Sequence, residues 1–257
     1  MLIPLPLSPG LSKRRVNFLI AGVQKAGTTA LYEALSTHPD VEMANRKEVH
    51  FFDKRPPTGI ANIDDWLYHR AFNWPARGPN TIFGEATPSY IWWSGALDRI
   101  KAYNPDIKLI ILLRDPVERA WSQHWMDVSL GRKDADFQVA MDAELAADQN
   151  RPDRVHSMLS RGLYLDQVQT VLDLFPNDQL LFLRTEDMAA DWPTAQNRVC
   201  RLLGIHAARM PYLPQANETP QKPDIPTDIR EQLIAFFKED AQATRRLLGW
   251  DQGSWCV

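Results

Sequence analysis

One short stretch near the N-terminus places the strongest limits on how this chain can fold. An apolar run beginning at Phe18 leads into a loop bounded by Gly22 and Gly27, and a helical pattern then opens on Thr28 and Thr29. A loop of this kind directs its backbone N–H groups and the N-terminus of the following helix at one anion. The sequence therefore predicts an α/β protein with a phosphate-binding loop.

The position of the lysine distinguishes this loop from the usual nucleotide-binding loop. That loop reads G-x-x-x-x-G-K-[ST] and holds a magnesium-bound triphosphate. Here the glycine spacing is kept, but Thr28 occupies the lysine position and Lys25 lies inside the loop. We therefore expect a phosphate-like group, with magnesium-ATP as a poor first choice. The residues expected to hold it are Lys25, Ala26, Gly27, Thr28 and Thr29.

Beyond the loop, strand patterns alternate with helix patterns. Such alternation implies right-handed crossovers and a parallel sheet covered by helices on both faces. Ligands of such sheets bind beyond the carboxyl ends of the strands, where the glycine loop and Arg114 are expected. The predicted strands are residues 16–21, 108–113 and 180–183, and the predicted helices are residues 28–37, 117–129, 164–174 and 227–248.

Length and composition predict one domain over residues 1–257. The chain is 44% hydrophobic and 24% charged, as in ordinary globular proteins. Residues 1–14 are broken by prolines and are predicted to be a peripheral or mobile tail. Residues 53–80 show no steady period, so they predict either a substrate-side insertion or a packed irregular excursion.

Several classes of function are disfavoured. The net charge of -3 argues against a general nucleic-acid binder, and the proline-broken N-terminus is too short to span a bilayer. The histidines show no H-x-x-H spacing, so no metal site is expected. Cys200 and Cys256 are two distant cysteines, as in proteins that keep their thiols reduced. We therefore expect a cytoplasmic protein without nucleic-acid or membrane partners; a homo-oligomer is left open.

Four further motifs follow the loop in order: Lys47–Asp53 (KEVHFFD), Gly84–Tyr90 (GEATPSY), Leu109–Ser122 (LIILLRDPVERAWS) and Arg161–Tyr164 (RGLY). Together they resemble sulfotransferases that use 3′-phosphoadenosine-5′-phosphosulfate (PAPS), in particular heparan-sulfate-type enzymes and their bacterial relatives. The resemblance implies a P-loop-kinase-like three-layer α/β fold with a central parallel sheet. It also implies sulfonyl transfer from PAPS to a hydroxyl of a carbohydrate or small-molecule acceptor, with release of 3′-phosphoadenosine-5′-phosphate (PAP) and no metal required.

The resemblance also assigns residues to the donor. Lys25 would meet the 5′-phosphate and the sulfonate oxygens, and Arg114 with Ser122 would hold the 3′-phosphate that distinguishes PAPS from ATP. An arginine at the end of an apolar strand points to an anion, although a structural pair with Asp115 or Glu118 is the alternative. The remaining donor-binding candidates are Arg161, Tyr164 and Lys222.

Sulfonyl transfer needs a base within hydrogen-bond reach of the acceptor hydroxyl. Glu48 and His50 are the candidates, because their alternate spacing places them on one side of an extended segment. The resemblance favours Glu48 as the base, with His50 orienting the acceptor or stabilising charge, although the two roles can be exchanged. Glu85 is expected to position the acceptor or to neutralise a neighbouring cation.

The chain departs from the heparan-type pattern at Ala86, where those enzymes usually have lysine. We therefore expect an acceptor that is smaller or less anionic than a sulfated glycan. Trp66, Trp74, Trp92 and Trp93 form either an aromatic wall for the acceptor or part of the core. The alternative functions are a nucleotide-dependent phosphotransferase (kinase) of the same fold and a non-catalytic nucleotide-binding protein.

Overall fold

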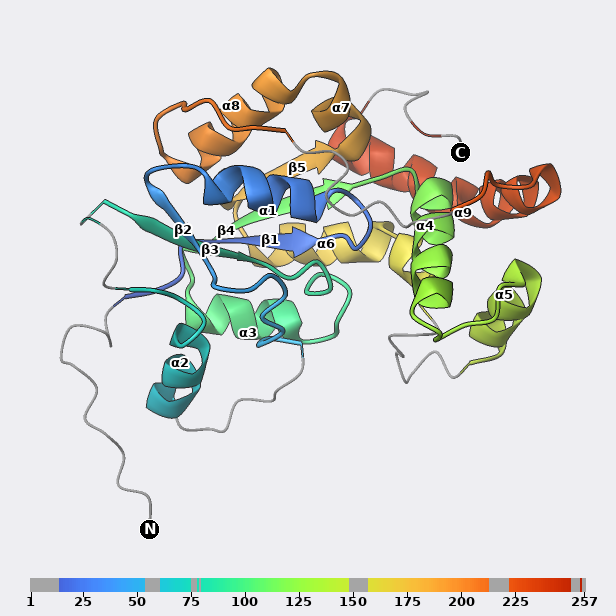
Figure 1. Cartoon of the computed structure of the whole chain (residues 1–257), viewed down its shortest axis with the longest axis horizontal. Coiled ribbons are helices and arrows are strands. Elements are labelled where there is room, and N and C mark those ends of the chain that lie inside the picture. Colours follow the sequence, from blue (N-terminus) through green and yellow to red (C-terminus); the bar gives the residue numbers. More distant parts are fainter. Residues whose placement is uncertain are drawn as a thin grey trace, which may run out of the picture.

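A five-stranded parallel sheet lies at the centre of the molecule, in the strand order β2-β3-β1-β4-β5 (Figure 1). The structure is a computed structural model that describes residues 14–53, 61–74, 78, 80–147, 157–212, 222–250 and 255. The strands are β1 (Phe18–Gly22), β2 (Val41–Met43), β3 (Ile82–Ala86), β4 (Lys108–Leu113) and β5 (Leu180–Arg184).

Helices cover both faces of this sheet, giving three layers (Figure 1). Helices α1, α7 and α8 lie over one face, and α3 and α6 lie over the other, while α4, α5 and α9 extend beyond the carboxyl ends of the strands. The helices are α1 (Thr28–Ser36), α2 (Ala61–His69), α3 (Ala96–Tyr103), α4 (Pro116–Ser129), α5 (Phe137–Ala146), α6 (Leu165–Leu174), α7 (Thr185–Ala190), α8 (Trp192–Leu203) and α9 (Thr227–Leu248), with short 3₁₀ turns η2 (Ser160–Gly162) and η3 (Asn177–Gln179).

The predicted α/β fold with a central parallel sheet is confirmed. Strand β4 and helix α9 have the predicted bounds, and β1, β5, α1, α4 and α6 differ from prediction by one or two residues at their ends. Apolar runs identified β1 and β4 because both faces of these strands are buried, with every residue of β1 shielded from solvent.

Strands β2 and β3 were not predicted. Strand β3 contains Gly84 and Glu85, residue types that are depleted in strands. A Cβ atom at Gly84 would lie 2.1 Å from the ring of Phe18, so the glycine lets β1 and β3 pack their side chains at close approach. The composition of β3 thus depends on packing against β1, a tertiary contact that no local sequence pattern reveals.

The described part of residues 53–80 contains α2 and the segment after it. Tyr68, Phe72 and Trp74 are buried there, and the indole of Trp74 stacks on Phe83 of β3 with ring centroids 4.3 Å apart. Trp66 on α2 is 44% exposed. Residues 54–60, 75–77 and 79 of this segment, and residues 1–13 of the predicted tail, lie outside the described residues.

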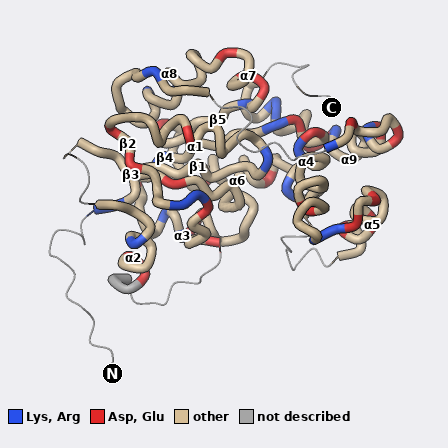
Figure 2. Tube along the Cα trace, in the orientation of Figure 1, with Lys and Arg blue, Asp and Glu red and all other residues tan. Residues whose placement is uncertain are grey.

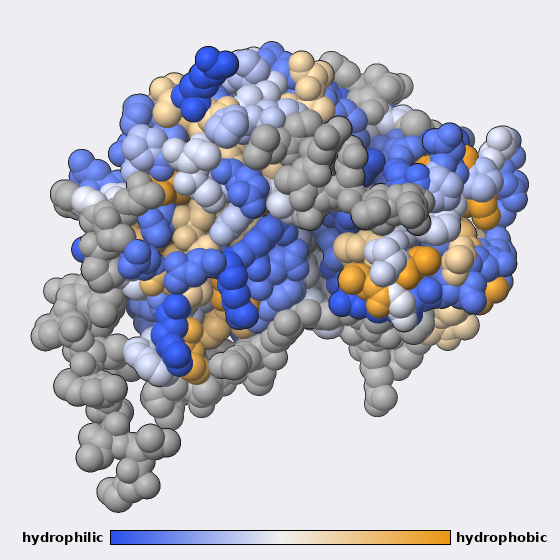
Figure 3. All heavy atoms as spheres, viewed as in Figure 1, coloured by the Kyte–Doolittle hydropathy of each residue, from blue (hydrophilic) through white to orange (hydrophobic). Residues whose placement is uncertain are grey.

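Both charged and apolar groups gather at the end of the molecule that carries α4. Lysine and arginine positions gather around the loop after β1, the start of α4 and the neighbouring α9 (Figure 2). Apolar atoms show over α4 and α5 (Figure 3), where Leu130, Val139 and Leu145 are each more than half exposed. Within the described residues, no helix has the length and apolar character needed to cross a bilayer.

Candidate active site

The predicted site residues come together at the carboxyl edge of the sheet. The glycine loop follows β1, the segment carrying Glu48 and His50 follows β2, and Arg114 follows β4. This is the edge at which open parallel sheets bind ligands.

The glycine loop has a fixed backbone. Lys25 has a φ of 69° and Gly27 a φ of 83°, both in the left-handed region. A Cβ at Gly27 would lie 3.0 Å from the terminal methyl group of Met188 on α7. The hydroxyl of Thr185 donates to the carbonyl of Ala26 at 2.8 Å. Residues of α7 therefore hold the loop in place.

Cations converge on the loop. Nη1 of Arg114 donates to the carbonyl of Lys25 at 3.1 Å. Burial, together with the charges of Arg114, Lys222 and Lys47, lowers the pKa of Lys25 from 10.5 to about 8. Cations held this close repel one another, and an anion placed among them relieves the repulsion. These residues therefore fit a phosphate or sulfonate group.

Tyr164 lies behind this cluster. Its ring is fully buried, and its hydroxyl donates to the carbonyl of Arg114 at 2.9 Å. Its backbone N–H donates to Asp240 of α9 at 2.7 Å. Tyr164 thus orients the backbone that carries Arg114. The predicted contact between its ring and a nucleotide stays a prediction.

Ser122 and Arg161 are the other two candidates for the 3′-phosphate. Ser122 is 6% exposed, on α4 two turns after Arg114. Arg161 is 5% exposed, and its guanidinium carbon lies 4.2 Å from the ring centroid of Trp92. Nε of Arg161 donates to the hydroxyl of Ser157 at 2.9 Å. Arg161 is therefore held by a stacked ring on one side and a hydroxyl on another.

Glu48 and His50 form a chain of charged groups with Asp53. Nε2 of His50 lies 3.2 Å from Oε2 of Glu48, and Nδ1 lies 2.7 Å from Oδ2 of Asp53. Ser89 donates to the same Asp53 oxygen at 2.6 Å. The side chain of Glu48 is 36% exposed, that of His50 17% and that of Asp53 0%. Glu48 is therefore the most exposed member of the chain.

The protonation states follow from these contacts. Burial alone would raise the pKa of Glu48, but hydrogen bonds and charge from His50 and Lys47 hold it at about 2. Nζ of Lys47 lies 2.8 Å from Oε1 of Glu48. Ionised carboxylates only accept hydrogen bonds. In the free protein Glu48 is thus ionised and accepts a hydrogen bond from Lys47.

The end of β3 fixes the backbone of this segment. Glu48 donates its N–H to the carbonyl of Ala86 at 2.9 Å, His50 donates to the hydroxyl of Thr87 at 3.4 Å, and Phe51 donates to that of Tyr90 at 3.1 Å. Glu48 and His50 have φ values of 61° and 56°. Non-glycine residues in this region are strained and are retained where the surroundings enforce them, often at functional sites.

Glu85 lies in β3, in the protein interior, and contacts the residues that hold the Glu48–Phe51 segment. Its side chain is fully buried and accepts hydrogen bonds from the hydroxyls of Tyr68 at 2.9 Å, Tyr90 at 2.8 Å and Thr87 at 2.6 Å. Burial raises the pKa of Glu85, an effect that the three donors partly offset. Two of these donors also hold the Glu48–Phe51 backbone, so Glu85 supports that segment from the core. Its predicted contact with the acceptor stays a prediction.

Sequence reasoning assigned no role to Asp53 or Ser89, and none at the donor site to Trp92. Asp53 was within the KEVHFFD motif, where an acidic residue three positions after His50 is a usable signal. Ser89 lies in the GEATPSY motif, 36 positions from Asp53, and nothing local indicates their contact. Lys47 was likewise given no role of its own, whereas its charge acts on Lys25.

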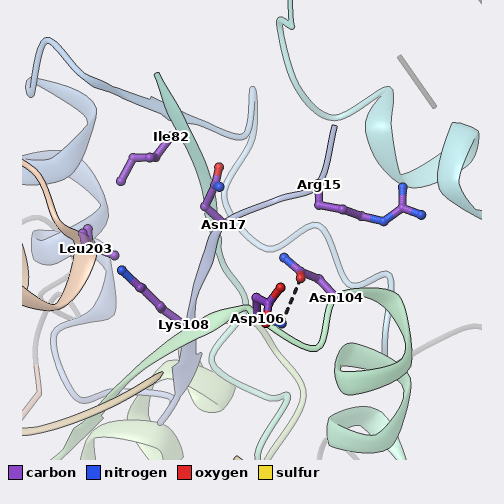
Figure 4. Close-up of a pocket in the computed structure, with 7 residues that line it drawn as sticks. All are labelled: Arg15, Asn17, Ile82, Asn104, Asp106, Lys108 and Leu203. Atoms are coloured by element: carbon purple, nitrogen blue, oxygen red, sulfur yellow. Dashed lines mark hydrogen bonds between the residues drawn. The ribbon is translucent and has the colours of Figure 1, made fainter. Parts of the chain in front are cut away.

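A cavity of about 380 Å³ lies at the opposite, amino edge of the sheet (Figure 4). Two of its lining side chains make contacts within the protein. Oδ1 of Asn17 accepts from the backbone N–H of Phe83, and Arg15 turns away from the cavity, where it pairs with Asp65 at 2.9 Å. The cavity is therefore separate from the site of the predicted chemistry. It is lined by Arg15, Asn17, Ile82, Asn104, Asp106, Lys108 and Leu203.

One group of potential metal ligands occurs among the described residues, although no spacing motif predicted it. His38, Asp40 and His206 bring their ligand atoms within 4.8 Å of one another. Nδ1 of His38 accepts from the backbone N–H of Asp40 at 3.1 Å, and its Nε2 lies 3.0 Å from the carbonyl of His206. His206 pairs with Asp40 at 2.7 Å. Both nitrogens of His38 are thus engaged, and the group joins the start of β2 to the end of α8.

Comparisons with known proteins agree with this geometry. The family model for the sulfotransferase domain matches residues 15–222. Mouse heparan sulfate glucosamine 3-O-sulfotransferase 3B1 is 34% identical over 194 residues, which are 76% of this chain and 47% of the relative. Human heparan sulfate glucosamine 3-O-sulfotransferase 6 is 35% identical over 202 residues, 78% of this chain and 56% of the relative. The chain thus spans about half the length of these curated relatives.

Solved structures give the same answer for the fold. A sulfotransferase from Alicyclobacillus acidocaldarius superposes with a TM-score of 0.80 at 28% identity, covering 95% of this chain and all of that one. The sulfotransferase domain of the Synechococcus olefin synthase shares the fold, with a TM-score of 0.53 at 16% identity, covering 92% and 94% of the two chains. The fold, the loop geometry and the family match lead to one conclusion: this chain belongs to the sulfotransferase domain family.

Proposed function

We propose that the protein transfers a sulfonyl group from PAPS to a hydroxyl of a carbohydrate or small-molecule acceptor and releases PAP. The observation that carries the proposal is the pairing of two features at one edge of the sheet. A cation cluster around Lys25 lies beside an ionised carboxylate, Glu48, and Lys47 interacts with both. The first feature suits an anionic donor and the second suits activation of a hydroxyl.

On the donor side, Lys25 and the backbone of residues 26–29 would hold the 5′-phosphosulfate. Arg114, Ser122 and Arg161 would hold the 3′-phosphate, with Lys222 reaching the donor from the segment before α9. The donor supplies the sulfonyl group and a phosphate leaving group. Lys25 is already in place before the reaction, so it can stabilise the negative charge that grows on that leaving group.

On the acceptor side, Glu48 is the proposed base. It is the most exposed member of the Glu48–His50–Asp53 chain, and both nitrogens of His50 already lie within 3.2 Å of a carboxylate oxygen. Glu48 takes the proton of the acceptor hydroxyl while the oxygen attacks the sulfur. Lys47 can turn from Glu48 toward the leaving group, which raises the basicity of Glu48 as negative charge develops elsewhere. His50, held by Asp53, keeps the carboxylate oriented.

Protein cations would take the place of a metal in this proposal. Among the described residues, the proposed donor site brings together Lys25, Lys47, Arg114, Arg161 and Lys222. On the acceptor side, Glu48, His50 and Asp53 contact one another.

A carbohydrate hydroxyl is the leading acceptor, because curated relatives are named as heparan sulfate glucosamine 3-O-sulfotransferases and a carbohydrate sulfotransferase. The acceptor is expected to be less anionic than heparan sulfate. Ala86 is fully buried at the position where heparan-type enzymes usually have lysine. Among the tryptophans, Trp74 is buried in the core and Trp92 contacts Arg161. The candidates for an aromatic wall beside the acceptor are therefore the partly buried Trp93 and the exposed Trp66.

Calorimetric titration with PAP, ADP and ATP, each with and without magnesium, tests the proposal. Micromolar PAP binding without metal, much weaker ADP binding, and loss of that preference in Arg114→Ala are expected. Preference for magnesium-ATP would instead support a kinase. If PAP binds but no sulfonyl transfer to a panel of sugars, phenols and alcohols is detected, the non-catalytic nucleotide-binding alternative gains support.

A further inference from the structure

Glu118, on the first turn of α4, faces three cations. Its carboxylate lies 2.9 Å from Nη2 of Arg230, 3.7 Å from Nη2 of Arg114 and 3.7 Å from Nζ of Lys222. Arg114 and Lys222 are two of the proposed donor ligands, and both also act on the pKa of Lys25. An acidic side chain therefore lies among the cations that are proposed to bind a phosphate dianion.

The three contacts are not equivalent. The 2.9 Å contact to Arg230 is a hydrogen-bonded ion pair, whereas 3.7 Å exceeds hydrogen-bond distance. Arg230 belongs to α9, so the close pair joins α9 to α4. The longer contacts leave Arg114 and Lys222 attracted to Glu118 by charge without being fixed by a directed bond.

A second contact holds the segment before α9 against α4. Nε1 of Trp121 donates to the carbonyl of Pro223 at 2.8 Å. Lys222 therefore belongs to a segment that is held against α4 by two contacts. One is the hydrogen bond from Trp121 to Pro223, and the other is the ion pair between Glu118 and Arg230 of α9. The ammonium group of Lys222 can therefore exchange one anion for another while these two contacts stay in place.

We propose that Glu118 is an internal, exchangeable counter-ion that competes with the donor's 3′-phosphate for Arg114 and Lys222. In the free protein Glu118 balances these cations. When the 3′-phosphate binds, Arg114 and Lys222 turn to it, and Glu118 remains neutralised by Arg230. The same carboxylate then repels the phosphate of the product and favours its release. This inference rests on the proposed function, because it takes the ligand to carry a 3′-phosphate.

Glu118→Gln tests the competition directly. The amide keeps the shape of the side chain and still accepts a hydrogen bond from Arg230, but it removes the negative charge. PAP should bind about threefold to tenfold more tightly, with a slower dissociation rate, because a like charge near the phosphate has been removed. Binding of ADP, which has no 3′-phosphate, should change by less than about twofold. Glu231→Gln, at an exposed position next to Arg230, makes the same change in net charge and serves as the control.

Arg230→Gln is the complementary variant. Without its hydrogen-bonded partner, Glu118 should hold Arg114 and Lys222 more strongly, and PAP should bind about threefold more weakly. In the Glu118→Gln background the same substitution should have a smaller effect, since Arg230 is proposed to act through Glu118. Thermal melts of each variant check that the fold is retained.

The outcomes separate this inference from the proposed function. If the unmodified protein does not prefer PAP to ADP, the proposed function fails. If it does prefer PAP, but Glu118→Gln leaves PAP affinity unchanged or weakens it, Glu118 is an organiser of the cations and the exchange inference is wrong. Equal tightening of PAP and ADP would likewise contradict competition at the 3′-phosphate.

Discussion

The guanidinium of Arg114 donates a hydrogen bond to the backbone carbonyl of Lys25 at 3.1 Å, across 89 positions of sequence. This bond links the end of β4 to the loop after the neighbouring strand β1. It places a second cation against the loop lysine, and burial with these charges lowers the pKa of Lys25 to about 8. The charge of Arg114 therefore acts on a lysine that lies inside the loop rather than after its second glycine.

The first prediction concerns the pH dependence of donor binding. As pH rises through about 8, the free protein loses the charge of Lys25, whereas a bound anion favours the charged form. PAP affinity should therefore fall between about pH 7 and about pH 9.5. Lys25→Arg should flatten the dependence, because arginine stays charged throughout this range. Titration calorimetry in buffers of different ionisation enthalpy should also detect proton uptake near pH 8.

The same pKa shift has a consequence for stability. Because the folded-state pKa of Lys25 lies below its ordinary value of 10.5, the unfolded chain binds more protons between about pH 8 and 10.5. The contribution of Lys25 to the free energy of unfolding should thus rise with pH in this window. Urea unfolding of the unmodified protein and Lys25→Met across the window measures it. A contribution that falls with pH would contradict the shift.

A second prediction separates the roles in the Glu48–His50–Asp53 chain. Glu48→Gln should lower kcat by about 10²- to 10⁴-fold, because it removes the base, and should leave the Kd for PAP within about twofold. Asp53→Asn should lower kcat by less, since Asp53 acts through His50. If Glu48→Gln keeps near-normal turnover at saturating donor while His50→Ala loses most of its activity, His50 is the base and Glu48 is not. Since the pKa of Glu48 is about 2, protonation of Glu48 should add no acid limb to the free enzyme's kcat/KM profile above about pH 4.

The third prediction concerns Glu85. Glu85→Gln keeps the size of the side chain but replaces one accepting oxygen with an NH₂ group that faces donor hydroxyls. We expect the free energy of unfolding to fall by about 2 kcal/mol, the range for a buried polar group left without a suitable partner. Chemical denaturation measures this, with Glu231→Gln as the exposed control. Unchanged stability with a raised KM for the acceptor would instead indicate that Glu85 contacts the acceptor.

The fourth prediction concerns Trp92. Its ring lies 4.2 Å from the Arg161 guanidinium, and a partly desolvated cation–π contact contributes about 1 kcal/mol. Trp92→Leu should therefore weaken PAP binding about fivefold, with little effect on ADP. Trp92→Phe should retain most of the affinity. The matched control is Trp66→Leu. Trp66 lies on α2 and makes a similar cation–π contact, with the guanidinium carbon of Arg70 4.9 Å from its ring centroid. Equal losses in the two leucine variants would contradict a role at the donor site.

Two of the expectations from sequence have no structural test. The cytoplasmic location and the oligomeric state stay predictions. The expected absence of a metal site rested on spacing alone, and His38, Asp40 and His206 show that spacing does not detect ligand types brought together from distant segments.

Much of the architecture could be predicted from the sequence because it depends on local pattern. Buried parallel strands such as β4 are continuous apolar runs, and a long amphipathic helix such as α9 has a clear period, so both had the correct bounds. Strand β3 could not be found in this way, because Gly84 and Glu85 are required by the ring of Phe18 and by hydroxyls from Tyr68 and Tyr90.

The sequence by itself determined the sheet class, the phosphate-binding loop and the candidate residues Lys25, Arg114 and Glu48, because these depend on residue type and spacing along the chain. Only the tertiary structure decided how those residues act together. It placed Arg114 and Lys47 against Lys25, enclosed Glu85 in the core and brought Arg230 of α9 to Glu118 of α4. The physical reason is that charge interactions depend on distance in space and on burial, and neither quantity can be read from one-dimensional spacing.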